Sequence, residues 1–95
     1  MKACVYTGVE SIEVQEVDHP DRGTEEVTIQ IARAGICGTD LHVYLGHMAD
    51  RVLPPRVLGH EMVGEVIDAP TTDRISVGDR VVVEPTVFCG RCGAC

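Results

Sequence analysis

The last seven residues of the chain, CGRCGAC, place Cys89, Cys92 and Cys95 at a regular spacing of three. Thiolates at this spacing bind zinc in structural sites, and the same spacing begins the ferredoxin run, whose fourth cysteine follows three residues later. The residue types by themselves leave three interpretations open: a zinc ribbon, part of an iron–sulfur site, or free thiols.

A second group of potential metal ligands comprises Cys37, His60 and Glu61. Thiolate, imidazole and carboxylate all belong to the zinc ligand set. Cys37 stands where a strand is expected to end, beside glycines that let the backbone approach a bound group closely. Adjacent side chains on a strand point to opposite faces, so His60 and Glu61 reach one ion only if the backbone turns locally, which Gly59 and Gly64 permit.

Other polar residues have ordinary structural interpretations. Thr39 or Asp40 is expected to cap a short helix, and His42 to be a solvated residue of that helix. His19 and His47 are expected to be loop histidines. From residue types alone, these structural interpretations are favoured over functional ones.

These residues must be positioned by a small domain of 95 residues that carries 15 acidic and 8 basic side chains, a net charge of −7. This charge disfavours nucleic acid or an anionic membrane as a partner. The chain contains no apolar run long enough for a membrane span, and MKACVYTG lacks the build of a signal peptide, so a cytoplasmic location is expected. In that compartment, five cysteines favour free thiols or metal ligands over disulfides.

The chain is rich in valine, its aromatic content is 3%, and glycine and proline are scattered throughout, which favours short strands. Cys4 is expected to be a small buried residue within the first of them. Gly64 indicates a bulge or a close backbone approach, and the continuous apolar run at the last strand indicates full burial. Five strands, one helix and a loop are predicted: strands at Lys2–Tyr6, Ile12–Gln15, Val27–Ala34, Met62–Ala69 and Val81–Val83, a short helix within Gly38–Leu45 and a loop over Gly46–Pro55.

Short strands in this number, with a single short helix, predict a mostly β fold that forms a small closed or partly closed barrel. Turns are expected near Thr7-Gly8, over His19–Gly23 and over Val77–Arg80. The sequence shows no alternation of strands and helices and contains no GxGxxG string. It therefore carries no dinucleotide-binding fingerprint.

Four strings occur together and in one order: GICGTDLHVY, PRVLGHEMVGEV, ISVGDRVVV and the CxxCxxC run. Together they resemble the N-terminal part of the zinc-dependent medium-chain dehydrogenases, a family of alcohol, polyol and threonine dehydrogenases. The resemblance implies a GroES-like, partly open β-barrel with one short helix. Residues 1–95 would be the N-terminal part of that catalytic domain, ending inside the structural-zinc lobe and before the Rossmann domain.

The same resemblance assigns roles to individual residues. Cys37 and His60 match ligands of the catalytic zinc, and Glu61 matches the acidic position beside it, a direct ligand in some members and a near neighbour in others. Asp40 matches the carboxylate that orients the histidine ligand, an arrangement that metal sites generally need. Thr39 matches the hydroxyl that bonds the substrate oxygen.

His42 matches the outer histidine of the family's proton relay. Cys89, Cys92 and Cys95 match the first three ligands of the structural zinc, and the intervening glycines permit the turns that this arrangement requires. The fourth ligand is expected several residues downstream. Without it the terminal segment is expected to be loose or stabilised by a partner, because a complete structural zinc contributes roughly 10–16 kcal/mol of apparent binding energy.

The implied activity is oxidation of an alcohol, a polyol or a similar hydroxyl compound, through a zinc alkoxide and hydride transfer. The implied cofactors are zinc and NAD or NADP, the latter bound by the Rossmann domain. The implied assembly is a homodimer or homotetramer. Residues 1–95 alone are expected to be inactive. Two alternatives stay open: a non-enzymatic metal-binding or electron-transfer module, and a zinc-free reductase of the same superfamily.

Overall fold

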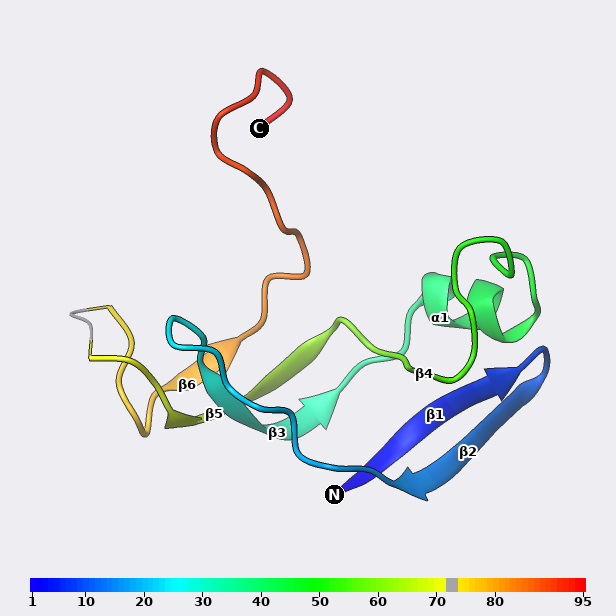
Figure 1. Ribbon diagram of the computed structural model, residues 1–95, viewed down its shortest axis with the longest axis horizontal. Coiled ribbons are helices and arrows are strands. Elements are labelled where there is room, and N and C mark those ends of the chain that lie inside the picture. Colours follow the sequence, from blue (N-terminus) through cyan, green and yellow to red (C-terminus); the bar gives the residue numbers. More distant parts are fainter. Residues whose placement is uncertain (72–73) are drawn as a thin grey trace.

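The computed structural model describes residues 1–71 and 74–95, which form two antiparallel three-stranded sheets (Figure 1). The strand order is β2-β1-β4 in the first sheet and β3-β5-β6 in the second. Strands outnumber helices, and the sheets are open, so the predicted mostly β fold with one short helix is confirmed for the described residues. The elements are β1 (Lys2–Gly8), β2 (Ser11–Glu16), β3 (Thr28–Ala34), α1 (Gly38–Tyr44), β4 (Arg56–Val57), β5 (Met62–Asp68) and β6 (Arg80–Val82).

The first sheet is a hairpin of β1 and β2 that gains a third strand from a distant segment. β1 extends to Gly8, so the turn falls at Val9 and Glu10, later than the predicted Thr7-Gly8. Glu10 adopts a positive φ of 57° there. The two-residue strand β4 pairs with β1 through Val5 and Val57 and was not predicted, because two residues are too few to show an alternating pattern.

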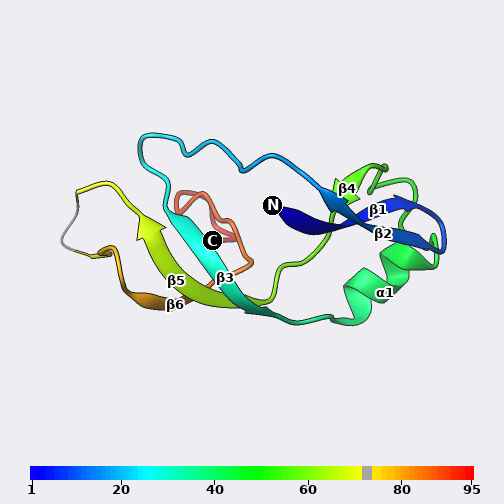
Figure 2. The same ribbon diagram turned by 90° about the horizontal axis from the view of Figure 1, so that it is seen from below.

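The hairpin turn also holds the end of α1, which lies beside the first sheet in both views (Figures 1 and 2). The N–H of Glu10 donates to the carbonyl oxygen of Tyr44 at 2.7 Å. A Cβ placed on Gly46 would lie 2.9 Å from the side chain of Val9, so hairpin and helix end are in close contact. These contacts fix the helix against the hairpin.

The second sheet contains the close approach predicted at Gly64. This residue is buried in β5 and pairs with Ile31 of β3, where the register shifts before Arg33. A Cβ on Gly64 would overlap the carbonyl oxygen of Gln30 and would lie 2.7 Å from Cγ2 of Ile29. Only glycine allows the two strands to approach this closely.

The buried apolar core is small. Val5 and Tyr6 of β1, Val43 of α1 and Val66 of β5 are the buried hydrophobic residues of the described chain. Cys4 was expected to be buried, but it is exposed. It pairs with Val14, which is 70% exposed, and the shared face of this hairpin is open to solvent.

Full burial was also predicted for Val81–Val83, and this prediction is wrong. Val82 is 78% exposed. β6 is an edge strand that pairs only with β5, and Val82 borders an open groove of about 460 Å³ in the described structure. A continuous apolar run is typical of a strand that is covered on both faces. The run does not specify which segments provide that cover.

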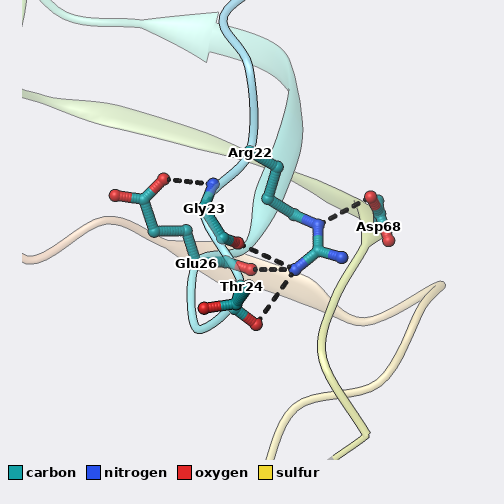
Figure 3. Close-up of polar contacts among 5 residues, drawn as sticks. All are labelled: Arg22, Gly23, Thr24, Glu26 and Asp68. Atoms are coloured by element: carbon teal, nitrogen blue, oxygen red, sulfur yellow. Dashed lines mark hydrogen bonds and ion pairs between the residues drawn. The ribbon is translucent and has the colours of Figure 1, made fainter.

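Arg22 joins the connection between β2 and β3 to the end of β5 (Figure 3). Its Nε donates to Oδ2 of Asp68 at 2.7 Å, and its Nη1 donates to the carbonyl oxygens of Gly23, Thr24 and Glu26. One guanidinium thereby ties the turn at Thr24 and Glu25 to the second sheet, and this turn falls later than the one predicted over His19–Gly23. No helix within the described ranges has the length and apolar character that crossing a membrane requires.

Candidate metal centres

The first candidate centre forms where β3 ends and β5 begins. These strands are antiparallel neighbours, Ala34 pairs with Met62, and the N–H of Gly35 donates to the carbonyl oxygen of Glu61 at 2.7 Å. The chain that leaves β3 therefore runs beside the chain that enters β5. As a result, Sγ of Cys37 lies 3.1 Å from Nε2 of His60, although 23 positions separate the two residues.

Cys37 is also the N-cap of α1. Its sulfur accepts the N–H of Thr39 at 3.2 Å, and Oδ2 of Asp40 accepts the N–H of Cys37 at 3.0 Å. The helix begins at Gly38, so the prediction that Thr39 or Asp40 is the cap is wrong. The predicted metal ligand takes the capping position, and Asp40 completes a capping box three residues later.

Glu61 completes a set of three different donor atoms. One ligand atom each from Cys37, His60 and Glu61 lies within 4.8 Å of the others. A Cβ on Gly35 would lie 2.6 Å from Oε2 of Glu61, so glycine at this position leaves room for the carboxylate. Sulfur, imidazole nitrogen and carboxylate oxygen suit zinc, and their spacing allows one ion to bind all three.

Asp40 lies near both Cys37 and His60, the two ligands that it could support. Its side chain is 13% exposed, and its Oδ1 lies 3.9 Å from Nδ1 of His60. Its other oxygen already bonds the backbone of Cys37. Beside the cluster is an open groove of about 470 Å³, so a small molecule can approach the candidate centre; the lining residues include Arg33, His60, Glu61, Val83 and Pro85.

Thr39 and His42 lie three positions apart on α1 and are both exposed. This spacing places them on one face of the helix. Nδ1 of His42 contacts Nδ1 of His47 at 3.0 Å, a pairing that was not predicted from the sequence. The available signal was Gly46, which marks a helix end that folds the next residue back.

The second candidate centre lies on the C-terminal segment, which leads away from both sheets (Figure 1). The sulfurs of Cys89 and Cys92 each lie 3.4 Å from that of Cys95, and all three side chains are exposed. Zinc–sulfur bonds of about 2.3 Å in a tetrahedron separate the sulfurs by about 3.8 Å. The three sulfurs therefore lie close enough together for a single ion to bind them.

Local hydrogen bonds lower the pKa of Cys89 from 9.0 to about 6. The backbone N–H groups of Arg91 and Cys92 contribute first, followed by the side chains of Cys95 and Cys92. Hydrogen bonds to a thiolate favour the charged form, so at pH 7 Cys89 is mostly the thiolate that binds metal.

Alkylation of Cys89 in the metal-free chain should therefore rise with a midpoint near pH 6 and level off above pH 7. Iodoacetamide labelling, followed by peptide mass spectrometry across that pH range, measures the profile. Zinc should suppress the labelling. A midpoint close to the ordinary thiol value would show that these hydrogen bonds do not act on Cys89.

Comparisons with known proteins show which family the chain resembles in sequence and fold. Residues 23–95 match the alcohol dehydrogenase GroES-like domain. The sorbitol dehydrogenase of Bacillus subtilis is 44% identical over an alignment that covers the whole of this chain and 28% of that protein. The L-threonine 3-dehydrogenase of Pyrococcus furiosus is 46% identical over an alignment that covers 87% of this chain and 25% of that protein. The whole chain also superposes on 28% of the alcohol dehydrogenase TADH from Thermus sp. ATN1, with a TM-score of 0.87 and 38% identity.

The chain thus spans about a quarter of the length of the relatives that it matches. The match includes both candidate centres, since it begins before Cys37 and ends at Cys95. On the combined support of sequence and fold, the chain belongs to the alcohol dehydrogenase GroES-like domain family.

Proposed function

We propose that residues 1–95 are the N-terminal part of the GroES-like catalytic domain of a zinc-dependent, NAD(P)-linked dehydrogenase. Its substrate would be a small alcohol or polyol. The observation that carries the proposal is the convergence of Cys37, His60 and Glu61, whose ligand atoms lie within 4.8 Å of one another beside an open groove. The names of the relatives support the reaction class, because they include sorbitol, threonine and zinc-type alcohol dehydrogenases.

The proposed cofactors have the same kind of support. A zinc-binding dehydrogenase from Sinorhizobium meliloti, 36% identical to this chain, was solved with NADP. A protein from Escherichia coli described as a short chain alcohol dehydrogenase, 35% identical, was solved with NADH. A longer polypeptide would bind the nucleotide with segments beyond residues 1–95 and would assemble as a homodimer or homotetramer. When bound, zinc polarises a hydroxyl oxygen and lowers its pKa, and the nicotinamide accepts hydride.

The chain's own residues would hold the ion and move the proton. Cys37 and His60 would be ligands, and the carboxylate of Glu61 would be the third. The carboxylate of Asp40 accepts the backbone N–H of Cys37, and this hydrogen bond holds the backbone that carries the sulfur. Support of this kind strengthens a metal site because it keeps each ligand in its binding orientation.

Thr39 would accept the hydroxyl proton of the substrate and pass it to His42, which is exposed and can release it to water. The two residues share a helix face, which keeps the path short. A positioned acid or base of this type typically contributes about 10²–10⁴-fold to the rate.

The purified 95-residue chain alone should show no NAD(P)-dependent oxidation of alcohols or polyols. It contains no GxGxxG string and so lacks the sequence that binds the dinucleotide pyrophosphate in this reaction class. NAD(P)H absorbance measured with a panel of small alcohols and polyols provides the test. Sustained turnover by this chain would show that nucleotide binding does not require segments beyond residues 1–95, contrary to the proposal.

The polypeptide that joins residues 1–95 to a nucleotide-binding domain should contain zinc and reduce NAD(P)⁺ with a hydroxyl substrate. Metal analysis and the same absorbance assay test this directly. A folded, active polypeptide without zinc would favour a zinc-free reductase. A brown protein with visible absorbance would favour an iron–sulfur electron carrier built on Cys89, Cys92 and Cys95.

A further inference from the structure

The contact between His42 and His47 is produced by the way in which α1 ends. Gly46 follows the C-cap Leu45 with a φ of +79°, and its N–H donates to the carbonyl oxygen of Val43 at 3.0 Å. The N–H of His47 donates to the carbonyl oxygen of His42 at 2.9 Å. These two bonds form a Schellman motif, which returns the chain over the last turn of the helix.

In a Schellman motif, the residue after the glycine lies against the third residue before the cap, and an apolar contact is common there. In this chain the two positions carry His47 and His42, whose ring centroids are 5.3 Å apart. Their Nδ1 atoms are 3.0 Å apart. The helix terminus therefore holds a pair of imidazoles in place of an apolar pair.

A contact between two Nδ1 atoms restricts the tautomers of both rings. One Nδ1 must carry a hydrogen and the other must be bare, because two N–H groups would repel and two bare nitrogens would have nothing to share. If His42 is the donor, its Nε2 is bare and can accept a proton. Both residues are exposed, so Nε2 of each ring can exchange its hydrogen with water.

We propose that His47 is a positioning residue that holds His42 as the Nδ1–H tautomer and receives its proton. The inference rests on the proposed function, in which His42 relays the substrate proton. A proton adds to Nε2 of His42, the Nδ1 proton of His42 moves to Nδ1 of His47, and the Nε2 proton of His47 leaves to water. One proton enters and one leaves, no electrons are transferred, and exchange with water restores the starting tautomers.

The tautomer is tested on the 95-residue chain without any activity assay. Long-range ¹H–¹⁵N correlation spectra of the ¹⁵N-labelled chain identify which nitrogen of each ring carries hydrogen. His42 should be Nδ1–H in the wild type and should change to Nε2–H in His47→Phe, which keeps a ring over the helix end but removes the acceptor. A wild-type chain in which His42 is Nε2–H overturns the inference.

The relay is tested on the polypeptide that includes the nucleotide-binding domain. His47→Phe should lower kcat for hydroxyl oxidation about tenfold with KM nearly unchanged, because proton transfer is affected and substrate binding is not. His47→Asn should keep the Nδ1–H tautomer of His42 but should not restore kcat, because its amide oxygen accepts a hydrogen bond and cannot take up and release a proton. His19→Phe is the control for loss of a histidine in the connection between β2 and β3.

The two proposals fail in different ways. An active enzyme whose kcat is unchanged by His47→Phe overturns the role of His47 and leaves the proposed function intact. A wild-type polypeptide that oxidises no hydroxyl substrate overturns the proposed function, and the relay role of His47 falls with it.

Discussion

Replacing Cys37 with serine should lower kcat/KM for hydroxyl oxidation by more than about 100-fold in the polypeptide that includes the nucleotide-binding domain. Loss of a residue that only supports a ligand typically costs about 10–100-fold in metal affinity or activity, and Cys37 would be a ligand itself. The substitution keeps an N-cap at α1, because the serine hydroxyl oxygen can accept the N–H of Thr39 in place of the sulfur, so the loss reports on metal binding. One equivalent of zinc should be lost with the activity.

Cys4→Ser is the matched control, since Cys4 is an exposed cysteine on β1 outside both candidate metal clusters. It should leave zinc content and kcat/KM unchanged. Asp40→Asn should give an intermediate loss of about 10–100-fold, because it alters the support of Cys37 and leaves the sulfur in place. Full zinc content and full activity in Cys37→Ser would refute the proposed catalytic centre.

Replacing Gly64 with alanine should destabilise the domain by about 3 kcal/mol, the upper part of the usual range for overpacking. The added Cβ overlaps the carbonyl oxygen of Gln30 and approaches the side chain of Ile29. Neither strand can yield without loss of pairing between β3 and β5, which also brings Cys37 beside His60. A domain of this size has marginal stability, so a loss of this magnitude is large.

Chemical denaturation of the zinc-loaded chain measures the change in unfolding free energy, and zinc content reports whether the first centre survives. Gly8→Ala is the control, because a Cβ on Gly8 meets no heavy atom within 4 Å. Its effect should stay within about 0.5 kcal/mol. Equal stability of Gly64→Ala and Gly8→Ala would show that β3 and β5 are not closely packed at Gly64.

Local patterns predicted most of the regular structure. Alternation in Ile12–Gln15 and Val27–Ala34 identified strands close to the observed bounds, because the period of a half-buried strand is a property of adjacent residues. A short helix was expected within Gly38–Leu45, after a cap at Thr39 or Asp40, and the observed helix spans Gly38–Tyr44. The cap was misassigned because cysteine is an unusual capping residue and preference tables favour Thr39 and Asp40.

Burial was predicted less well than secondary structure. Cys4 and Val82 belong to strands, as expected, but both are exposed. Residue type specifies an average environment, whereas exposure depends on which segment covers each face of a sheet. The strand β4 and the Schellman end of α1 likewise depend on pairing and backbone angles that short stretches of sequence do not reveal.

By itself, the sequence determined which donor atoms are available and which family carries them. Thiolate, imidazole and carboxylate are properties of Cys37, His60 and Glu61 wherever the chain goes. Only the tertiary structure decided that these three meet, since the antiparallel register of β3 and β5 brings Cys37 and His60 to 3.1 Å. It also decided that His47, which sequence patterns assign to a loop, contacts His42, because backbone hydrogen bonds at the helix end fold the chain back onto α1.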